Sequence, residues 1–204
     1  GRALQDCRTW ESRVLLKINL SLVDLMSPEH VEEICSTLAS SGVDPSRITF
    51  ELKETSFARN FHEVEPAIQK LRALGCGIAL DDFGIEYSSL RYVQKLSPNV
   101  IKIDKSFVDL VESDLSSRSI ITTIVELAKN VGAKSVAEGV ETSAQASLLC
   151  SIGCDEMQGY HFSKPVSRDD AAELLRNEQR EGRRLETEAF SASSHPPRRD
   201  REAA

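Results

Sequence analysis

The 204-residue sequence has no apolar run near the roughly 18 residues that a transmembrane helix needs. Its start lacks the basic segment and apolar core of a secretory signal. The five cysteines are scattered without a Cys-x-x-Cys pair, which argues against a disulfide framework and a zinc ribbon. These absences predict a chain without a membrane segment in a reducing cytoplasm.

Positive charge is also scarce, with 25 Lys and Arg against 32 Asp and Glu, for a formal net charge of −7. This balance disfavours a broad surface for a long nucleic acid, although a local metal site could still receive a small anionic ligand. Length and a hydrophobic content of 40% predict one domain, over residues 1–186. Residues 187–204 lack apolar periodicity and are expected to form a disordered polar tail.

Short apolar runs alternate with longer amphipathic stretches, which predicts βαβ crossovers and a parallel sheet. The expected strands are Val14–Leu20, Ile48–Leu52, Gly77–Leu80, Val100–Ile103, Lys134–Ala137 and Glu156–Phe162. The expected helices are Ala3–Trp10, Pro28–Ser40, Phe61–Leu74, Ser88–Leu96, Ser116–Val131, Ser143–Ile152 and Arg168 to about Arg184.

Each expected strand ends in polar residues, although both faces of a parallel sheet are usually buried and a charge there is costly unless it is paired or binds metal. Period-2 alternation places Lys102 and Asp104 on one face and their isoleucine neighbours on the other. The carboxyl ends of parallel strands meet at one mouth, where α/β proteins place their sites. The converging residues are Asn19, Glu51, Asp81, Asp82, Lys102, Asp104, Glu138 and Gln158.

A single acid at a strand end is commonly a helix cap, but recurrence on strand after strand favours a metal site. Oxygen ligands without His or Cys favour Mg²⁺ or Mn²⁺ over zinc. The adjacent Asp81 and Asp82 suit a bridge between two cations, as in phosphoryl transfer. Lys102 would neutralise a phosphate or orient the attacking water. The pattern predicts phosphodiester hydrolysis.

These residues lie in segments that resemble, in order, the signature segments of the EAL domain, over about residues 3–175. The segments are Lys17-Ile-Asn-Leu-Ser21, Glu51-Leu-Lys-Glu-Thr55, Ala79-Leu-Asp-Asp-Phe-Gly84, Lys102-Ile-Asp-Lys-Ser-Phe-Val108, Val136-Ala-Glu-Gly-Val-Glu-Thr142 and Gln158-Gly-Tyr160.

The resemblance implies a modified (β/α)8 TIM barrel of the EAL type, of which about six β/α units are present here. It also implies hydrolysis of cyclic di-GMP to linear pGpG with two Mg²⁺ or Mn²⁺ ions, and a homodimer formed through the EAL domain.

The resemblance further implies roles for single residues. Asn19, Glu51 and Asp81 match ligands of one metal, and Asp81, Asp82 and Glu138 match ligands of the other. Lys102 matches the catalytic lysine, and Glu138 also matches the general base. Among supporting positions, Gln158 matches a glutamine of the site and Glu54 a residue that anchors the loop after Asp82, while Asp104 and Glu141 match further motif positions.

Two departures from the family pattern keep an alternative open. No Glu-Ala-Leu segment precedes Asn19, and we expect this sequence to be a truncated part of a longer chain. Its six strands would not close an eight-stranded barrel. The loop after Asp82 has Ile85 and Glu86 where the family commonly has Thr and Gly, and the added negative charge opposes an anionic substrate. The alternative is a catalytically inactive EAL module that binds cyclic di-GMP or a protein partner in signalling. An unrelated TIM-barrel metalloenzyme is a third hypothesis.

Overall fold

The computed structural model describes residues 2–10, 14–54, 61–85 and 90–177. The chain divides into two compact units, Gly1–Lys164 and Pro165–Ala204. In the second unit residues 168–177 are helical, in agreement with the start of the last predicted helix. The predicted polar tail, 187–204, lies outside the described residues. No helix in the described ranges combines the length and the apolar character needed to cross a membrane.

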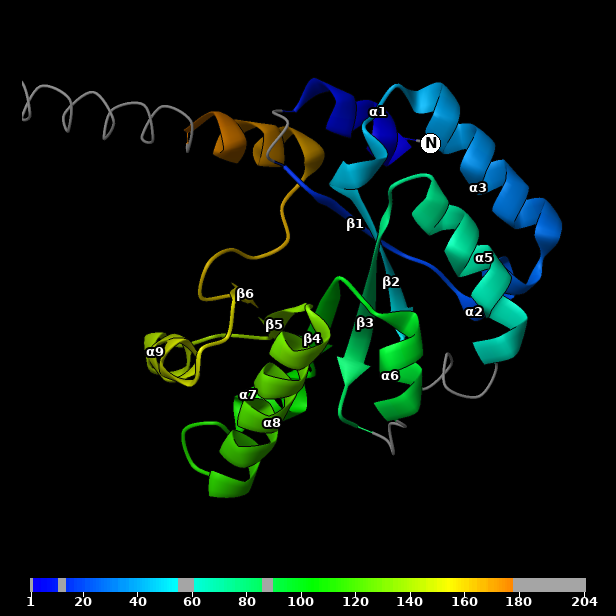
Figure 1. Ribbon diagram of the computed structural model, residues 1–204. Coiled ribbons are helices and arrows are strands. Elements are labelled where there is room, and N and C mark those ends of the chain that lie inside the picture. Colours follow the sequence, from blue (N-terminus) through cyan, green and yellow to red (C-terminus); the bar gives the residue numbers. More distant parts are fainter. Residues whose placement is uncertain (1, 11–13, 55–60, 86–89, 178–204) are drawn as a thin grey trace, which may run out of the picture. The chain divides into compact units, whose positions relative to one another are not determined.

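The first unit is built on a six-stranded parallel sheet in the order β1-β2-β3-β4-β5-β6 (Figure 1). Sequential order with parallel pairing requires each connection to cross one face of the sheet, which is the topology of a β/α barrel. The strands are β1 (Leu16–Asn19), β2 (Ile48–Lys53), β3 (Gly77–Phe83), β4 (Val100–Ile103), β5 (Lys134–Glu138) and β6 (Glu156–Gln158).

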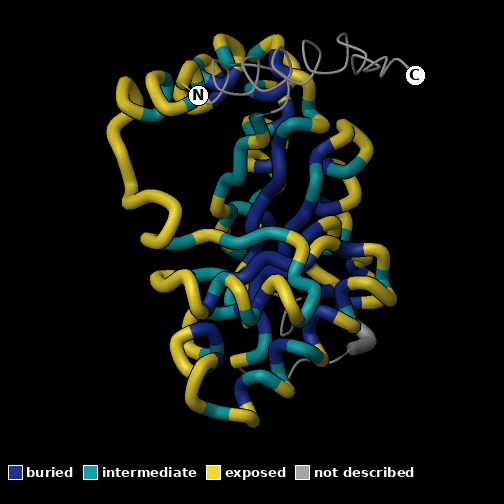
Figure 2. The backbone as a smooth tube through the Cα atoms, turned by 90° about the vertical axis from the view of Figure 1, so that its left-hand side faces the viewer, coloured by how far each residue is buried: buried dark blue, intermediate teal, exposed yellow. Residues whose placement is uncertain are grey.

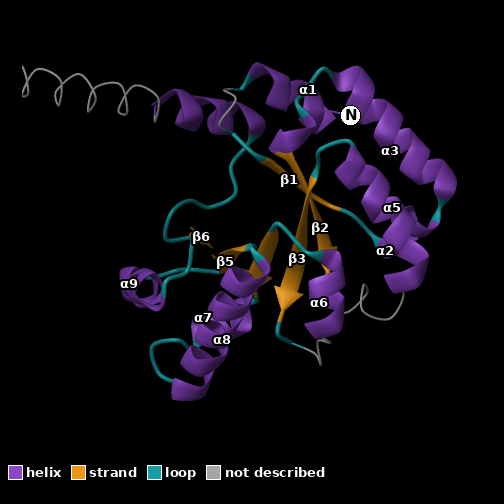
Figure 3. Ribbon diagram, in the orientation of Figure 1, coloured by secondary structure: helices purple, strands orange, loops and turns teal. Residues whose placement is uncertain are grey.

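Helix α1 precedes the first strand, and the other helices of this unit occupy the connections between strands (Figure 3). They are α1 (Arg2–Thr9), α2 (Leu22–Met26), α3 (Pro28–Ser41), η1 (Pro45–Arg47), α5 (Phe61–Ala73), α6 (Leu90–Leu96), α7 (Lys105–Asp109), α8 (Leu115–Val131) and α9 (Ser143–Ile152). Helix α8 packs on β4 and β5, and α5 packs on β3. The short α2, η1 and α7 lie in segments for which the sequence predicted no helix, and each begins at a polar cap.

Alternation along the strands separates an apolar face from a polar one. Ile101 and Ile103 of β4 are fully buried in the main core with the side chains of the helices, whereas Lys102 points to the opposite face. The same alternation holds in β2, where Phe50 and Leu52 flank Glu51. Figure 2 shows that the buried part of the backbone runs through the strands. The predicted apolar face is therefore confirmed.

The sheet curls so that its outer strands approach each other. Strands β1 and β6 are not neighbours in the sheet, yet the Lys17 ammonium lies 3.8 Å from a carboxylate oxygen of Glu156. Glu156 also pairs with Lys134 of β5 at 2.9 Å. An ion pair across the concave side requires a curved sheet. The fold is thus α/β and TIM-barrel-like, as predicted.

The last predicted strand, Glu156–Phe162, is too long. Strand β6 ends at Gln158, and the following residues form turns because the chain folds back over Val140. The backbone N–H of Val140 donates to the Gln158 carbonyl at 3.0 Å, and that of His161 donates to the Val140 carbonyl at 2.9 Å. Gly159 makes this close approach possible, since a Cβ there would collide with the Val140 backbone.

Candidate active site

A β-bulge brings two consecutive carboxylates to the same mouth of the sheet. Leu80 pairs with Ile101 and Phe83 pairs with Ile103, so Asp81 and Asp82 together lie opposite the single residue Lys102. Asp82 has a left-handed backbone, with φ of 55°, which Asp tolerates better than most residues. In a regular strand these neighbours would point to opposite faces. The bulge removes that constraint.

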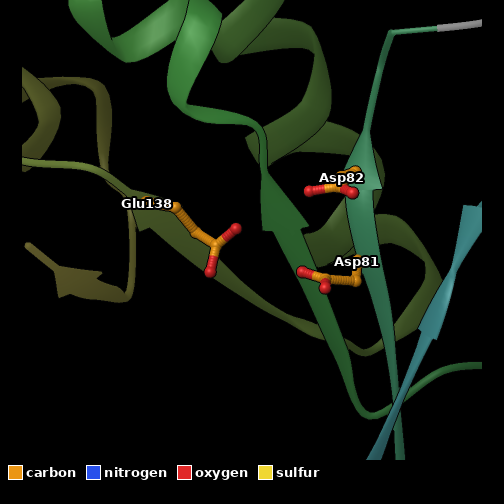
Figure 4. A group of neighbouring side chains, drawn as sticks. All are labelled: Asp81, Asp82 and Glu138. Atoms are coloured by element: carbon orange, nitrogen blue, oxygen red, sulfur yellow. The ribbon is translucent and has the colours of Figure 1, made fainter. Parts of the chain in front are cut away.

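Figure 4 shows the result: Asp81 and Asp82 both point across β4 toward Glu138, at the end of β5. One oxygen of each carboxylate lies within 4.8 Å of the others. Asp81 is buried, and Asp82 and Glu138 are half-buried. Three carboxylates this close repel one another unless positive charge lies between them.

Lys102 supplies part of that charge from the centre of β4. Its Nζ lies 2.7 Å from Asp81 Oδ1, 2.8 Å from Glu138 Oε1 and 3.0 Å from Glu51 Oε1. The lysine side chain is only 5% exposed. Burial lowers the pKa of Lys102, but the contacts with Asp81, Glu138 and Glu51 outweigh it and raise the pKa above its ordinary value. The ammonium is therefore permanently charged at neutral pH.

For Glu138, the effect of burial on the pKa is larger than the effect of the neighbouring opposite charge. Burial raises the pKa of its carboxyl above the ordinary value, and the negative charges of Asp81 and Glu51 act in the same direction. The neighbouring Lys102 ammonium opposes this rise without cancelling it. Glu138 is consequently a stronger proton acceptor than an exposed glutamate.

A second lysine, which the sequence analysis did not single out, faces the same cluster. Lys53 ends β2, and its ammonium lies 2.8 Å from Asp82 Oδ2. Alternation could have identified it, because Lys53 follows Glu51 by two residues and so shares its face. Among the basic residues at the strand ends, only Lys102 was predicted, and Lys53 was missed.

Glu54 is buried, and it contacts the backbone of the segment that follows Asp82. Its carboxylate accepts a hydrogen bond from the Gly84 N–H at 2.9 Å. Gly84 has φ of 102°, which favours glycine, and a Cβ there would press against Phe107 and Ile124. Ile85 is 54% exposed. Glu86 lies outside the described residues.

Asn19 and Gln158 lie at the ends of the two outer strands. Asn19 pairs in register with Glu51, and Gln158 pairs in register with Glu138, so each is next to a carboxylate of the cluster. Both side chains are exposed. A cavity of about 610 Å³ opens beside Asn19 and is also lined by Glu51, Lys53 and Asp81. Its volume is that of an ordinary small-ligand site.

Asp104 and Glu141 are not members of the group of three clustered carboxylates. Strand β4 ends at Ile103, as predicted, and Asp104 is the next residue. Asp104 caps α7, where its Oδ1 accepts a hydrogen bond from the Ser106 N–H at 2.8 Å. Glu141 is exposed and forms an ion pair with Lys105.

The donor set fits a divalent metal. All the clustered donors are carboxylate oxygens, which Mg²⁺ and Mn²⁺ prefer. Within the described ranges, Glu51 Oε1 and Asp81 Oδ1 are buried without an aligned hydrogen-bond donor, although Lys102 lies at ion-pair distance from both. Buried charged oxygens of this kind are stabilised by a cation.

The fold and this centre define a class of protein: a TIM-barrel-like domain with acids and a buried lysine at the carboxyl ends of its strands. Comparison with known families is more specific. Residues 1–165 match the EAL domain, and the chain belongs to that family. The resemblance seen in the sequence is confirmed, and so is the EAL type of the fold.

A curated relative is the bifunctional diguanylate cyclase/cyclic di-GMP phosphodiesterase MucR of Pseudomonas aeruginosa, with 33% identity over 74% of this chain and 22% of that protein. The chain spans between 21% and 24% of the length of the first curated relatives it matches.

Two solved structures show the same fold with ligands. The phosphodiesterase PaMucR in complex with c-di-GMP has a TM-score of 0.79 and 30% identity, over 83% of this chain and 70% of that structure. BlrP1 of Klebsiella pneumoniae in complex with manganese and cyclic di-GMP has a TM-score of 0.76 and 29% identity, over 81% of this chain and 43% of that structure.

Proposed function

We propose that this domain is a metal-dependent phosphodiesterase that hydrolyses cyclic di-GMP to linear pGpG. The observation that carries the proposal is the β-bulge, which turns Asp81 and Asp82 together toward Glu138 around the Lys102 ammonium. Family membership and the cyclic di-GMP complexes of two structural neighbours support the choice of substrate.

Two divalent cations, Mg²⁺ or Mn²⁺, would supply water activation and charge neutralisation at the scissile phosphate. Asn19, Glu51 and Asp81 would hold one cation, and Asp81, Asp82 and Glu138 would hold the other. Register pairing supports this division, since Asn19 lies beside Glu51, while Glu138 faces both aspartates of β3.

Lys102 and Glu138 would have different roles in the reaction: Lys102 would stabilise negative charge, and Glu138 would accept a proton. Lys102 keeps its proton at neutral pH, so its ammonium would stabilise the negative charge that develops on the phosphate oxygens. Glu138, whose pKa is raised by burial, would accept the proton of the attacking water. Because Lys102 lies 2.8 Å from Glu138 Oε1, the two groups can act on the same phosphate.

The remaining predicted residues would act through position. Glu54 would hold the loop after Asp82 through the Gly84 N–H, and exposed Gln158 would lie beside Glu138 at the mouth. Asp104 and Glu141 would support the neighbouring connections, since Asp104 caps α7 and Glu141 pairs with Lys105.

The proposal is tested by incubating the purified chain with cyclic di-GMP and Mn²⁺ or Mg²⁺ and separating pGpG by chromatography. We expect turnover that a chelator abolishes and that Glu138→Gln reduces by at least about a hundredfold, the range of a lost general base. Glu156→Gln is the matched control, because Glu156 is also half-buried and ion-paired but belongs to the other end of the strands. Tight cyclic di-GMP binding without turnover would favour the inactive signalling module instead.

We also propose that the domain acts in the cytoplasm and forms a homodimer. All five cysteines are free and three are buried, which suits a reducing compartment. Sedimentation equilibrium would test the dimer: a mass of one chain at micromolar concentration would contradict it.

A further inference from the structure

Lys53 neutralises a carboxylate of the candidate metal site from outside the cluster. It is the last residue of β2 and pairs in register with Asp81 of β3. Its side chain is 64% exposed, and its ammonium lies 2.8 Å from Asp82 Oδ2. The Asp82 carboxylate is the same group that faces Glu138 across the mouth.

With Lys53 in place, every carboxylate of the cluster already has an ammonium partner. Lys102 pairs with Asp81 and Glu138, and Lys53 pairs with Asp82. A divalent cation among these oxygens would lie within a few ångströms of both ammonium groups, and charges of the same sign repel at that distance. Metal binding is therefore opposed until one lysine moves away.

The two lysines differ in how easily they can move. The Lys102 side chain is 5% exposed and is held by three ion pairs, so withdrawal would leave buried carboxylates without a partner. The Lys53 ammonium extends into solvent and pairs with one half-buried aspartate. Exposed ion pairs of this kind contribute little free energy and exchange readily with water. Lys53 is the group that can leave.

We propose that Lys53 is a tethered competitor of the divalent metal at Asp82, and that it lowers the affinity of this site for metal. The inference rests on the proposed function, because it assigns a control of affinity to the same metal site. The lysine occupies Asp82 in the metal-free protein and moves into solvent when a cation binds, so the site fills only when metal is abundant.

The test is calorimetric titration of Mn²⁺ into the metal-free chain and into the variants Lys53→Gln, Lys53→Arg and Lys134→Gln. We expect Lys53→Gln to bind Mn²⁺ roughly three- to tenfold more tightly. The variant has no Lys53–Asp82 ion pair to break and no ammonium group at this position to repel the cation. Lys53→Arg keeps the charge and should retain an affinity close to that of the unchanged chain.

Lys134→Gln is a closely matched control. The Lys134 side chain is 63% exposed and pairs with Glu156 at 2.9 Å, almost the geometry of the Lys53 pair, but it begins β5 rather than ending a strand at the mouth. Its removal changes the net charge equally, so an equal gain of affinity in this variant would assign the effect to overall charge and overturn the inference.

The remaining outcomes separate the inference from the function on which it rests. If the unchanged chain and Lys53→Gln bind Mn²⁺ with the same affinity, Lys53 is no competitor and the inference fails while the metal site stands. If no variant binds Mn²⁺ at millimolar concentration, the proposed metal-dependent function itself fails. Binding by Lys53→Gln that exceeds binding by the charge-retaining Lys53→Arg supports the competition directly.

Discussion

Replacing Lys102 by Met should destabilise the metal-free protein more than any other lysine-to-methionine change in the described strands. The side chain is 5% exposed, and its ammonium lies 2.7–3.0 Å from three carboxylates. Methionine fills a similar volume, so the main loss is the charge that separates Glu51, Asp81 and Glu138. Removing one member of a buried ion-pair network costs about 3–5 kcal/mol.

That loss is a large part of the roughly 5–15 kcal/mol by which a domain of this size is stable. Lys134→Met is the control, because an exposed pair contributes at most about 1 kcal/mol. The assay is urea unfolding followed by circular dichroism, with a chelator present. Mn²⁺ should restore part of the stability of Lys102→Met, since a cation can take the place of the ammonium among the carboxylates.

The reasoning would be refuted if Lys102→Met and Lys134→Met unfolded at the same urea concentration. It would also be refuted if Mn²⁺ stabilised both variants equally, because the carboxylates would then not share their charge with Lys102.

Three further predictions concern the frame of the site. Gly159→Ala should reduce both stability and turnover, because its Cβ would push against the Val140 backbone beside Glu138; thermal unfolding and a pGpG assay check this together. Ile101→Ala should lower the free energy of unfolding by about 2–5 kcal/mol in urea titrations, since Ile101 is fully buried in the main core. Hydrogen bonds from the Ser135 N–H and from its hydroxyl lower the pKa of Asp155 below its ordinary value of 3.8. The ionised Asp155 therefore stabilises the folded protein at pH values above 3.8, and this stabilisation is lost as the pH falls through the lowered pKa. In Asp155→Asn the free energy of unfolding should therefore fall less steeply as the pH drops below about 4. An unchanged pH dependence of the free energy of unfolding would contradict this.

Alternation of apolar and polar residues was enough to predict the sheet and its polar mouth. Strand β4 has the predicted bounds, and β2 and β5 extend by one residue. Valine or isoleucine occurs in all three strands, and both residue types are enriched in strands. The predicted ends of some strands differ from those in the structure. The turn at Gly159 depends on a backbone contact with Val140, which is distant in sequence, so no local pattern marks the end of β6.

The short helix α7 was not predicted from the sequence. Asp104 follows the predicted end of β4 and precedes Lys105-Ser106, and an aspartate at that point can begin a helix. In the structure the Ser106 N–H donates to Asp104, which caps α7. A helix of five residues is too short for the helical periodicity of apolar residues to identify it.

The bulge at Asp81 and Asp82 is the feature that simple alternation hides. A regular register would send one of the two carboxylates to the apolar face, where a charge is costly. Two consecutive acids at a strand end were therefore themselves a signal of a bulge, since only an extra residue brings both to the mouth. The partnership of Asp82 with Lys53 follows from this geometry.

The most direct test of the account is the position of Mn²⁺ in crystals grown with the metal and a non-hydrolysable analogue of cyclic di-GMP, located by anomalous scattering. We expect anomalous peaks within coordination distance of the Asp81 carboxylate, one of them also contacting Asp82 and Glu138. Mn²⁺ bound elsewhere, with these three carboxylates still paired only to lysines, would contradict it.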